Sequence, residues 1–290
     1  MNTDKPLSKL LEFSIINIDK PSGPTSFGVS NFIRKKLLEL GVRKTSHFGT
    51  LDPKVTGVLP IALNRACKLT GFFLGHDKEY VGIMRIHSEM QMKEIQDVIN
   101  KKFLGKIKQT PPVKSRVKRQ EREREIKSFE LLGVKENPKD ILFKCEVQGG
   151  TYIRKLIDDL GKEIGIGAHM LELRRIKAGI FKEDKSITID DFEKAVDEYK
   201  KGNEKLLKEI LIPAEDAIKK ILPVIEVKED VVKQLFTGKP IHKNDLKEKI
   251  NIDKGELVSI FNKEKFIGIY KIINDKEIFA KAGFVMQEIK

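Results

Sequence analysis

Residues 78–87 read Lys-Glu-Tyr-Val-Gly-Ile-Met-Arg-Ile-His and form the clearest β-strand pattern in the chain. Tyr80, Met84 and Ile86 fall on one face of this strand, and other apolar residues fall on the opposite face. The pattern predicts a sheet strand. The fold is therefore expected to be built around a sheet that contains residues 78–87.

Further elements are expected on both sides of this strand. Strands are predicted at residues 14–19, 58–63, 126–134 and 141–147, and amphipathic helices at residues 26–40 and 152–164. Strands and helices are interleaved without regular alternation, which predicts an α+β domain.

The pattern changes near residue 222. Residues 190–218 are charged and expected to be helical, and Pro213 and Pro223 bracket a predicted linker. Beyond it, short strands are expected at residues 224–227, 256–261, 265–272 and 278–284, around a small helix at 231–236. The expected organisation is an N-terminal extension (1–13), a large catalytic domain (14–221) and a small β-barrel (222–290).

The composition favours an anionic partner. The 290 residues carry a formal net charge of +13 and the pI is about 9.4. A strongly basic chain most often binds nucleic acid or another anionic surface, because phosphate binding is driven by charge. A high lysine content alone is weaker evidence, because AT-rich genomes also enrich lysine and isoleucine, so composition leaves the partner open.

Cysteine usage and hydropathy fit a cytoplasmic protein. Cys67 and Cys145 are the only cysteines, and their spacing matches neither a metal site nor a disulfide framework. No signal peptide and no membrane-spanning stretch is expected.

Two charged residues are candidates for chemistry. Asp52 lies in Gly49-Thr50-Leu51-Asp52-Pro53, where it is either a structural turn residue or a nucleophilic carboxylate. Arg154 lies in the first turn of the helix expected at 152–164, where a cation opposes the helix dipole. It is either a surface cation or a group that holds a carboxylate in place.

Three further residues have both a structural and a functional interpretation. Tyr80 is either a core residue of its strand or a side chain that stacks on a base. Lys20, followed by Pro21-Ser22-Gly23-Pro24, either lies in a plain surface turn or supports a catalytic loop and contacts phosphate. His47 is either a loop histidine with internal partners or a phosphate contact.

A basic run follows Pro111-Pro112. Residues 114–119 read Lys-Ser-Arg-Val-Lys-Arg. Such a run is either solvated surface or a loop that follows phosphates, and Lys114 and Arg116 are its candidate RNA contacts.

The order of these motifs resembles the TruB/dyskerin family of RNA pseudouridine synthases over nearly the whole chain. The matching segments are Lys20–Ser26, His47–Pro60, Lys78–Tyr80, Gly150–Gly161 and Leu173–Arg175. The resemblance implies a mixed, mainly antiparallel sheet followed by a barrel of the PUA type. It implies that Asp52 is the nucleophile, that Arg154 pairs with it, and that Tyr80 stacks on the target uridine. It also places Tyr152 and Leu173 at the uridine site.

The resemblance extends to a subtype. Bacterial members carry a long insertion after the segment that begins at Gln109, and this chain lacks it. That absence is similar to the archaeal and eukaryotic branch, which works with H/ACA guide RNAs. The implied partners are a guide RNA, a target RNA and small protein subunits, and no metal or organic cofactor is implied. The family pattern differs at Ser46, Phe48, Phe27 and Arg116.

The expected function is isomerisation of uridine to pseudouridine in RNA, guided on ribosomal RNA and extending to transfer RNA. Two alternatives are a stand-alone transfer RNA synthase and a scaffold that assembles a ribonucleoprotein without catalysis. The sequence does not decide whether Asp52 attacks the ribose or promotes a glycal intermediate.

Overall fold

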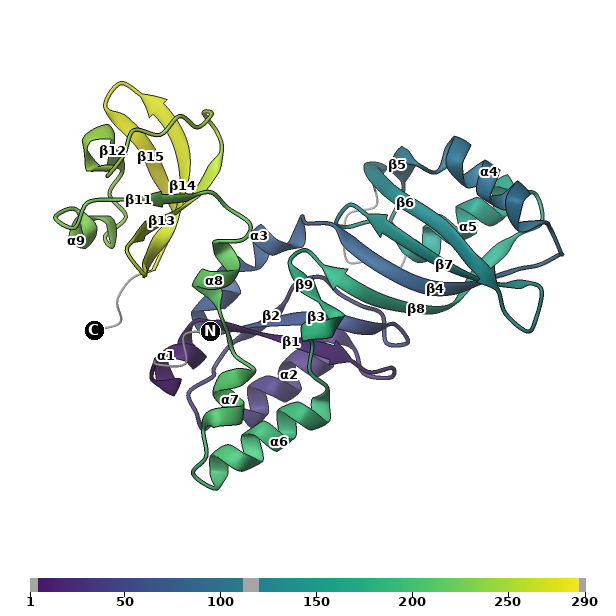
Figure 1. Ribbon diagram of the computed structural model, residues 1–290, viewed down its shortest axis with the longest axis horizontal. Coiled ribbons are helices and arrows are strands. Elements are labelled where there is room, and N and C mark those ends of the chain that lie inside the picture. Colours follow the sequence, from purple (N-terminus) through teal and green to yellow (C-terminus); the bar gives the residue numbers. More distant parts are fainter. Residues whose placement is uncertain (1–4, 112–119, 287–290) are drawn as a thin grey trace. The chain divides into compact units, whose positions relative to one another are not determined.

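The computed structural model describes residues 5–111 and 120–286, and it divides into two compact units, Met1–Ile212 and Pro213–Lys290 (Figure 1). The domain bounds expected from the sequence stay predictions. Residues 7–12 are not a loose extension, because Leu7, Leu10 and Leu11 are buried in the core of the first unit.

The first unit is built on a ten-stranded sheet with the order β10-β1-β3-β8-β4-β7-β6-β5, to which β2 and β9 add at β3 and β8. The strands are β1 (Ser14–Lys20), β2 (Thr45–His47), β3 (Thr56–Leu63), β4 (Lys78–Ile86), β5 (Gly105–Gln109), β6 (Arg122–Val134), β7 (Asp140–Val147), β8 (Ala168–Ala178), β9 (Phe181–Lys182) and β10 (Ile212–Pro213). The predicted strand at 78–87 lies inside this sheet, between β8 and β7.

Most neighbouring strands of this sheet are antiparallel, whereas β3 and β8 pair in parallel. Gly57 lies opposite Arg175 in that pair. Its φ is +102°, and a Cβ there would lie 2.2 Å from the carbonyl oxygen of Arg175. Only glycine permits this approach, which brings β8 against the loop that precedes β3.

Helices cover the sheet and complete the core. They are α1 (Leu7–Glu12), α2 (Ser26–Lys36), η1 (Asn64–Leu69), α3 (Thr70–Leu74), α4 (Met92–Lys102), α5 (Ile153–Glu163), η2 (Glu183–Lys185), α6 (Ile189–Lys200) and α7 (Lys205–Glu209). The Thr25 side chain caps α2 by accepting a hydrogen bond from Gly28 N. Both amphipathic helices predicted from periodicity are confirmed, although α2 ends at Lys36, short of the predicted residue 40. The buried apolar residues are Val29 and Ile33 in α2 and Ile153, Leu156, Ile157 and Leu160 in α5.

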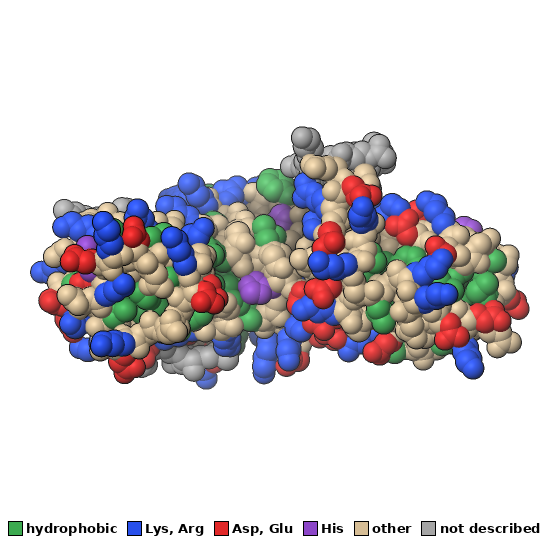
Figure 2. Space-filling view, turned by 90° about the horizontal axis from the view of Figure 1, so that it is seen from above, with side chains coloured by type: hydrophobic (Ala, Val, Ile, Leu, Met, Phe, Trp, Pro, Cys, Tyr) green, Lys and Arg blue, Asp and Glu red, His purple; other side chains and the backbone are tan. Residues whose placement is uncertain are grey.

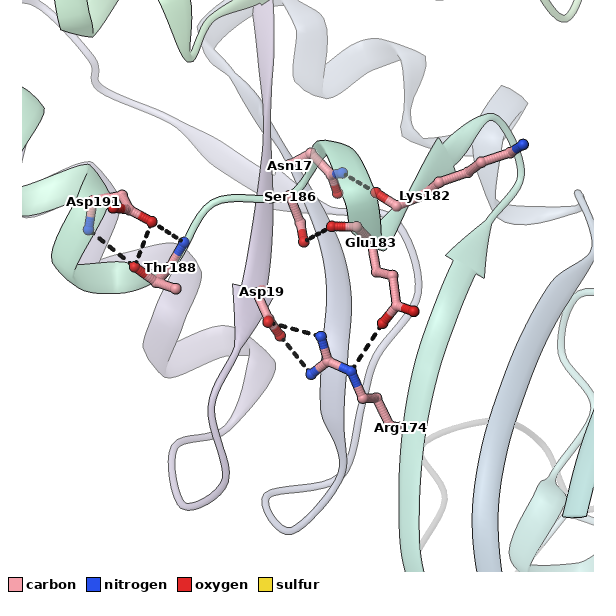
Figure 3. Close-up of polar contacts among 8 residues, drawn as sticks. All are labelled: Asn17, Asp19, Arg174, Lys182, Glu183, Ser186, Thr188 and Asp191. Atoms are coloured by element: carbon pink, nitrogen blue, oxygen red, sulfur yellow. Dashed lines mark hydrogen bonds and ion pairs between the residues drawn. The ribbon is translucent and has the colours of Figure 1, made fainter. Parts of the chain in front are cut away.

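An ion-pair network joins β1 to β8. The Arg174 guanidinium donates to both oxygens of Asp19 at 2.8 and 2.9 Å, and to Glu183 at 3.0 Å (Figure 3). The paired donors of arginine match a carboxylate geometrically. This network ties β1, which ends at Lys20, to β8, which contains Leu173.

The helical segment expected at 190–218 is broken. α6 ends at Lys200, and Gly202 takes a positive φ of +93° before α7 begins. The chain is then extended at β10, and a separate helix, α8 (Ala214–Ile218), follows. The prediction was wrong because a glycine and Pro213 interrupt the helix within an otherwise polar, helix-forming composition.

The second unit contains a curled five-stranded half-barrel with the order β11-β13-β14-β15-β12. The elements are β11 (Val224–Glu226), α9 (Val232–Leu235), β12 (Ile241–His242), η3 (Lys243–Asp245), β13 (Leu257–Asn262), β14 (Lys265–Asp275) and β15 (Ile278–Val285). Its core is separate from that of the first unit. The predicted four strands and helix are confirmed, whereas the two-residue strand β12 was not predicted.

Candidate active site

Asp52 lies in the loop between β2 and β3, and its side chain is 53% exposed. The Arg154 guanidinium, which comes from α5, contacts a carboxylate oxygen of Asp52 at 2.5 Å. These residues are 102 positions apart in the chain. The structure therefore joins the two candidate catalytic groups while leaving Asp52 open to a ligand.

Arg154 stands at the beginning of α5, directly after its N-cap residue Tyr152 and Ile153. The Gln109 side chain holds the backbone of Tyr152, accepting from its N–H at 3.0 Å and donating to its carbonyl at 3.3 Å. These two bonds fix the beginning of the helix that presents Arg154 to the Asp52 carboxylate.

Lys20 is fully buried at the end of β1. Its ammonium donates to the carbonyls of Pro21, Pro53 and Val55 at 2.8, 2.9 and 2.8 Å. Burial lowers the pKa of Lys20, and the nearby Asp52 carboxylate opposes that shift. The lysine therefore ties the backbone that directly follows Asp52 to the end of β1.

A second set of bonds joins the same two loops. The Ser26 hydroxyl accepts from Leu51 N at 2.7 Å and donates to the Leu51 carbonyl at 2.9 Å. Gly23 N donates to the Pro53 carbonyl at 2.9 Å. The segment 21–26 and the loop 49–55 therefore form one rigid body that holds Asp52.

We expect Lys20→Met to impair catalysis more than stability. Methionine removes the cost of burying a charge but leaves three carbonyls without their donor, and we expect a net loss of about 2 kcal/mol in unfolding free energy. A displaced Asp52 should slow single-turnover product formation by about tenfold or more. Denaturant unfolding and single-turnover rates measure both effects. Lys54→Met, at an exposed position of the same loop, is the control. Equal rates for the two variants would show that Lys20 does not hold the Asp52 loop in its catalytic position.

Tyr80 is buried on β4, where it lies opposite Arg175 of β8. Burial raises the pKa of the Tyr80 phenol, and interaction with the Arg175 guanidinium opposes this rise. Asp52 is near enough to contribute to the same shift. The tyrosine is both a core residue and a neighbour of the candidate nucleophile.

Arg175 belongs to the matching segment Leu173–Arg175, but its contacts with the Asp52 loop are not predicted from the sequence. Its side chain is 1% exposed, and it donates to the carbonyls of Val58 at 2.8 Å and Gly49 at 3.0 Å. It thereby fixes the beginning of the Asp52 loop and faces Tyr80. The signal in the sequence is the alternation of the strand. Arg175 lies two residues after the apolar Leu173 and therefore on the same, inward face of β8.

Lys78 is a second buried cation beside Arg175. Its ammonium donates to the Leu74 carbonyl at 2.9 Å and to the His76 carbonyl at 2.5 Å. Burial and the Arg175 charge lower the pKa of Lys78 to about 8. Lys78 therefore bonds the beginning of β4 to the end of α3 and to the turn that follows it.

The remaining predicted site residues are His47, Leu173, Lys114 and Arg116. His47 contacts the Thr50 hydroxyl at 3.0 Å, and burial lowers its pKa. Leu173 is buried on β8, opposite Gly82. Lys114 and Arg116 lie outside the described residues, so their predicted RNA contacts stay predictions.

Two further observations concern metal ions and membranes. Within residues 5–111 and 120–286, no group of three or more His, Cys, Asp or Glu side chains is placed to hold a metal ion. Over those same ranges, every helix is too short or too polar to cross a membrane.

Comparisons with known proteins agree with the site. Residues 35–153 match the family model of the TruB family pseudouridylate synthase N-terminal domain, and residues 154–219 match the tRNA pseudouridylate synthase B C-terminal domain. A probable tRNA pseudouridine synthase B of Nanoarchaeum equitans is 40% identical over 99% of this chain and 81% of its own length. A protein of the same name from Pyrococcus horikoshii is 39% identical over 99% of this chain and 85% of its own.

Solved structures show the same similarity. A Cbf5-Nop10-Gar1 complex contains a chain with a TM-score of 0.86 and 35% identity, covering 98% of this chain and 88% of that one. An H/ACA RNP bound to a substrate RNA containing 2'-deoxyuridine contains a chain with a TM-score of 0.85 and 33% identity, covering 98% and 88%.

The sheet, the Asp52–Arg154 pair and these matches define an RNA-modifying isomerase. The chain belongs to the TruB family of pseudouridylate synthases, enzymes that convert uridine to pseudouridine in RNA. The predicted family and reaction are confirmed.

Proposed function

We propose that the chain is the catalytic subunit of an H/ACA guide RNA particle. The support is its similarity over 98% of its length to chains solved within a Cbf5-Nop10-Gar1 complex and an H/ACA RNP. Only residues 110–121 separate β5 from β6, so the long insertion of bacterial enzymes is absent at this point. The proposed partners are a guide RNA, a target RNA and small protein subunits.

The observation that carries the chemistry is the 2.5 Å contact between Arg154 and Asp52. In the reaction the N1–C1′ bond breaks, the base rotates, and C5 bonds to C1′ while the C5 proton is lost and N1 gains one. Asp52 supplies a carboxylate that either attacks C1′ or removes a ribose proton to give a glycal. The Arg154 guanidinium holds that carboxylate in its orientation, so Arg154 is a positioning residue.

The base needs a separate holder. A uridine must leave its stack before Asp52 reaches it, and an aromatic ring then replaces the lost stacking. Tyr80 lies opposite Arg175 in the sheet, and Arg175 bonds to the Gly49 carbonyl of the Asp52 loop, which supports Tyr80 in this role. Accepting the C5 proton would require the phenolate form, which burial disfavours, so the raised pKa of Tyr80 favours holding the base. Tyr152 and Leu173 complete the proposed uridine site, and Lys20 and His47 support the loop that forms it.

The test of guidance is a conversion assay on one target uridine with and without guide RNA, followed by mass-shift labelling of the product. We expect conversion of a ribosomal RNA fragment to depend on the guide. Equal conversion without guide would instead support a stand-alone enzyme. The relatives named tRNA pseudouridine synthase B make transfer RNA the second substrate to test. No conversion of either substrate would support the scaffold alternative.

The half-barrel is the proposed PUA domain that holds the guide RNA. Its five strands enclose a core of their own, and the sequence bounds proposed for it are residues 222–290. Lys and Arg side chains are interleaved with acidic ones on the viewed face of the molecule (Figure 2), so phosphate contacts are expected at many separate points.

Removing residues 222–290 should weaken guide RNA binding and reduce its salt dependence, because fewer phosphates are neutralised. The remaining fragment should stay folded, since every buried residue of the first core precedes residue 212. Guided conversion should fall more than any unguided conversion. Filter-binding titrations at several salt concentrations compare the full and shortened chains. Identical affinities and slopes would mean that this region does not hold the guide.

A cytoplasmic location is also proposed, which the free thiols of Cys67 and Cys145 support.

A further inference from the structure

Phe27 is the most exposed large hydrophobic side chain in the described part of the chain. Its exposed fraction is 72%, whereas the next is Leu132 at 49%. A single exposed apolar residue needs no explanation by itself. Phe27 differs because of what its neighbours in the chain contact.

The backbone that carries Phe27 is fixed to the candidate nucleophile. Phe27 lies in the first turn of α2, which Thr25 caps, and it directly follows Ser26. Ser26 is fully buried and makes two hydrogen bonds to the backbone of Leu51, the residue before Asp52. The backbone that carries this exposed ring is therefore fixed, one residue from the bonds that position the Asp52 loop.

Rigid placement suits a stacking surface. A ring whose backbone is already ordered loses little conformational freedom when it contacts a base. A uridine drawn out of its strand leaves a neighbouring base without one stacking partner, and an aromatic face restores it. A phenyl ring offers no hydrogen-bonding group, so it accepts any base. That property suits an enzyme whose target is chosen by base pairing elsewhere.

We propose that Phe27 stacks on the substrate nucleobase next to the target uridine and so holds the strand while the uridine enters the site. This inference rests on the proposed function, since it takes RNA presented to Asp52 as the substrate. It makes Phe27 a substrate-binding residue and not a catalytic one. Its loss should affect substrate affinity and leave the chemical step of bound substrate nearly unchanged.

The experiment uses the full chain with guide RNA and without it. The probe is a synthetic RNA with one target uridine and 2-aminopurine placed either directly 5′ or directly 3′ of it, since stacking quenches this fluorophore. Phe27→Ala removes the ring, Phe27→Leu keeps apolar bulk without a flat face, and Phe27→Trp keeps a flat face. Leu132→Ala, which removes an exposed apolar side chain from β6, is the matched control.

We expect the wild-type chain and Phe27→Trp to quench one of the two probes, and Phe27→Ala and Phe27→Leu not to. Substrate dissociation constants should rise about 5- to 100-fold for Phe27→Ala, as for loss of one base–aromatic stack. Leu132→Ala should match the wild type. Quenching by Phe27→Ala equal to that of the wild type, or full retention by Phe27→Leu, would overturn the proposal.

The two proposals fail in different ways. The fluorescence readout reports binding, so it tests Phe27 whether or not product forms. Quenching that depends on Phe27 without any pseudouridine would refute the proposed catalytic function and keep the stacking residue. Normal conversion, together with quenching by Phe27→Ala equal to that of the wild type, would keep the proposed catalytic function and refute the stacking role of Phe27.

Discussion

Replacing Asp52 with asparagine is expected to abolish pseudouridine formation while RNA binding survives. The amide has nearly the same size, but it can neither attack C1′ nor accept a ribose proton. The side chain is half exposed and its contact with Arg154 is a surface ion pair, so its loss should change the unfolding free energy by at most about 1 kcal/mol. Product is measured by mass-shift labelling and binding by filter titration.

Asp158→Asn is the matched control for Asp52→Asn. It makes the same chemical change at an exposed ion pair with Lys162 on α5. We expect its rate to equal that of the wild type. Substantial turnover by Asp52→Asn would remove Asp52 from its proposed role, whereas loss of RNA binding would show that the residue holds substrate.

Local patterns predicted local structure well. β4 spans Lys78–Ile86 and α5 spans Ile153–Glu163, each within a residue or so of its expected limits, because burial alternates along the first and follows one helical face of the second. The order of the strands in the sheet does not follow from such local patterns. The parallel contact of β3 with β8 joins segments over a hundred residues apart, and no periodicity encodes it. The two-residue β12 is too short to carry a pattern.

The candidate site divides in the same way. Asp52 and Arg154 were recognised through their motifs, and the fold then brings them into contact. The buried cations were harder to interpret. Lys20 and Arg175 bind backbone carbonyls, which leave no trace in the sequence because every residue has one. Lys20 was noted only because prolines and a glycine surround it, and Arg175 only as part of a matching segment.

Arg154→Lys is expected to slow the chemical step by about 10²-fold. Lysine keeps the positive charge, but its ammonium lacks the planar group that contacts the Asp52 carboxylate at 2.5 Å, and a misplaced catalytic group costs a factor of this order. Single-turnover kinetics at saturating enzyme isolate this step from binding. Because both side chains are more than half exposed, thermal stability should be nearly unchanged.

The control for Arg154→Lys is Arg34→Lys, which makes the same change on α2, where Arg34 bonds to Asn31 of its own helix. A slow Arg154→Lys variant beside a normal Arg34→Lys variant would assign the loss to the carboxylate partner and not to a general change of surface charge. Binding of RNA should be equal in both variants, since each keeps its positive charge. Rates within a few-fold of wild type for Arg154→Lys would show that charge alone suffices to hold Asp52, and the positioning role of the guanidinium would then be wrong.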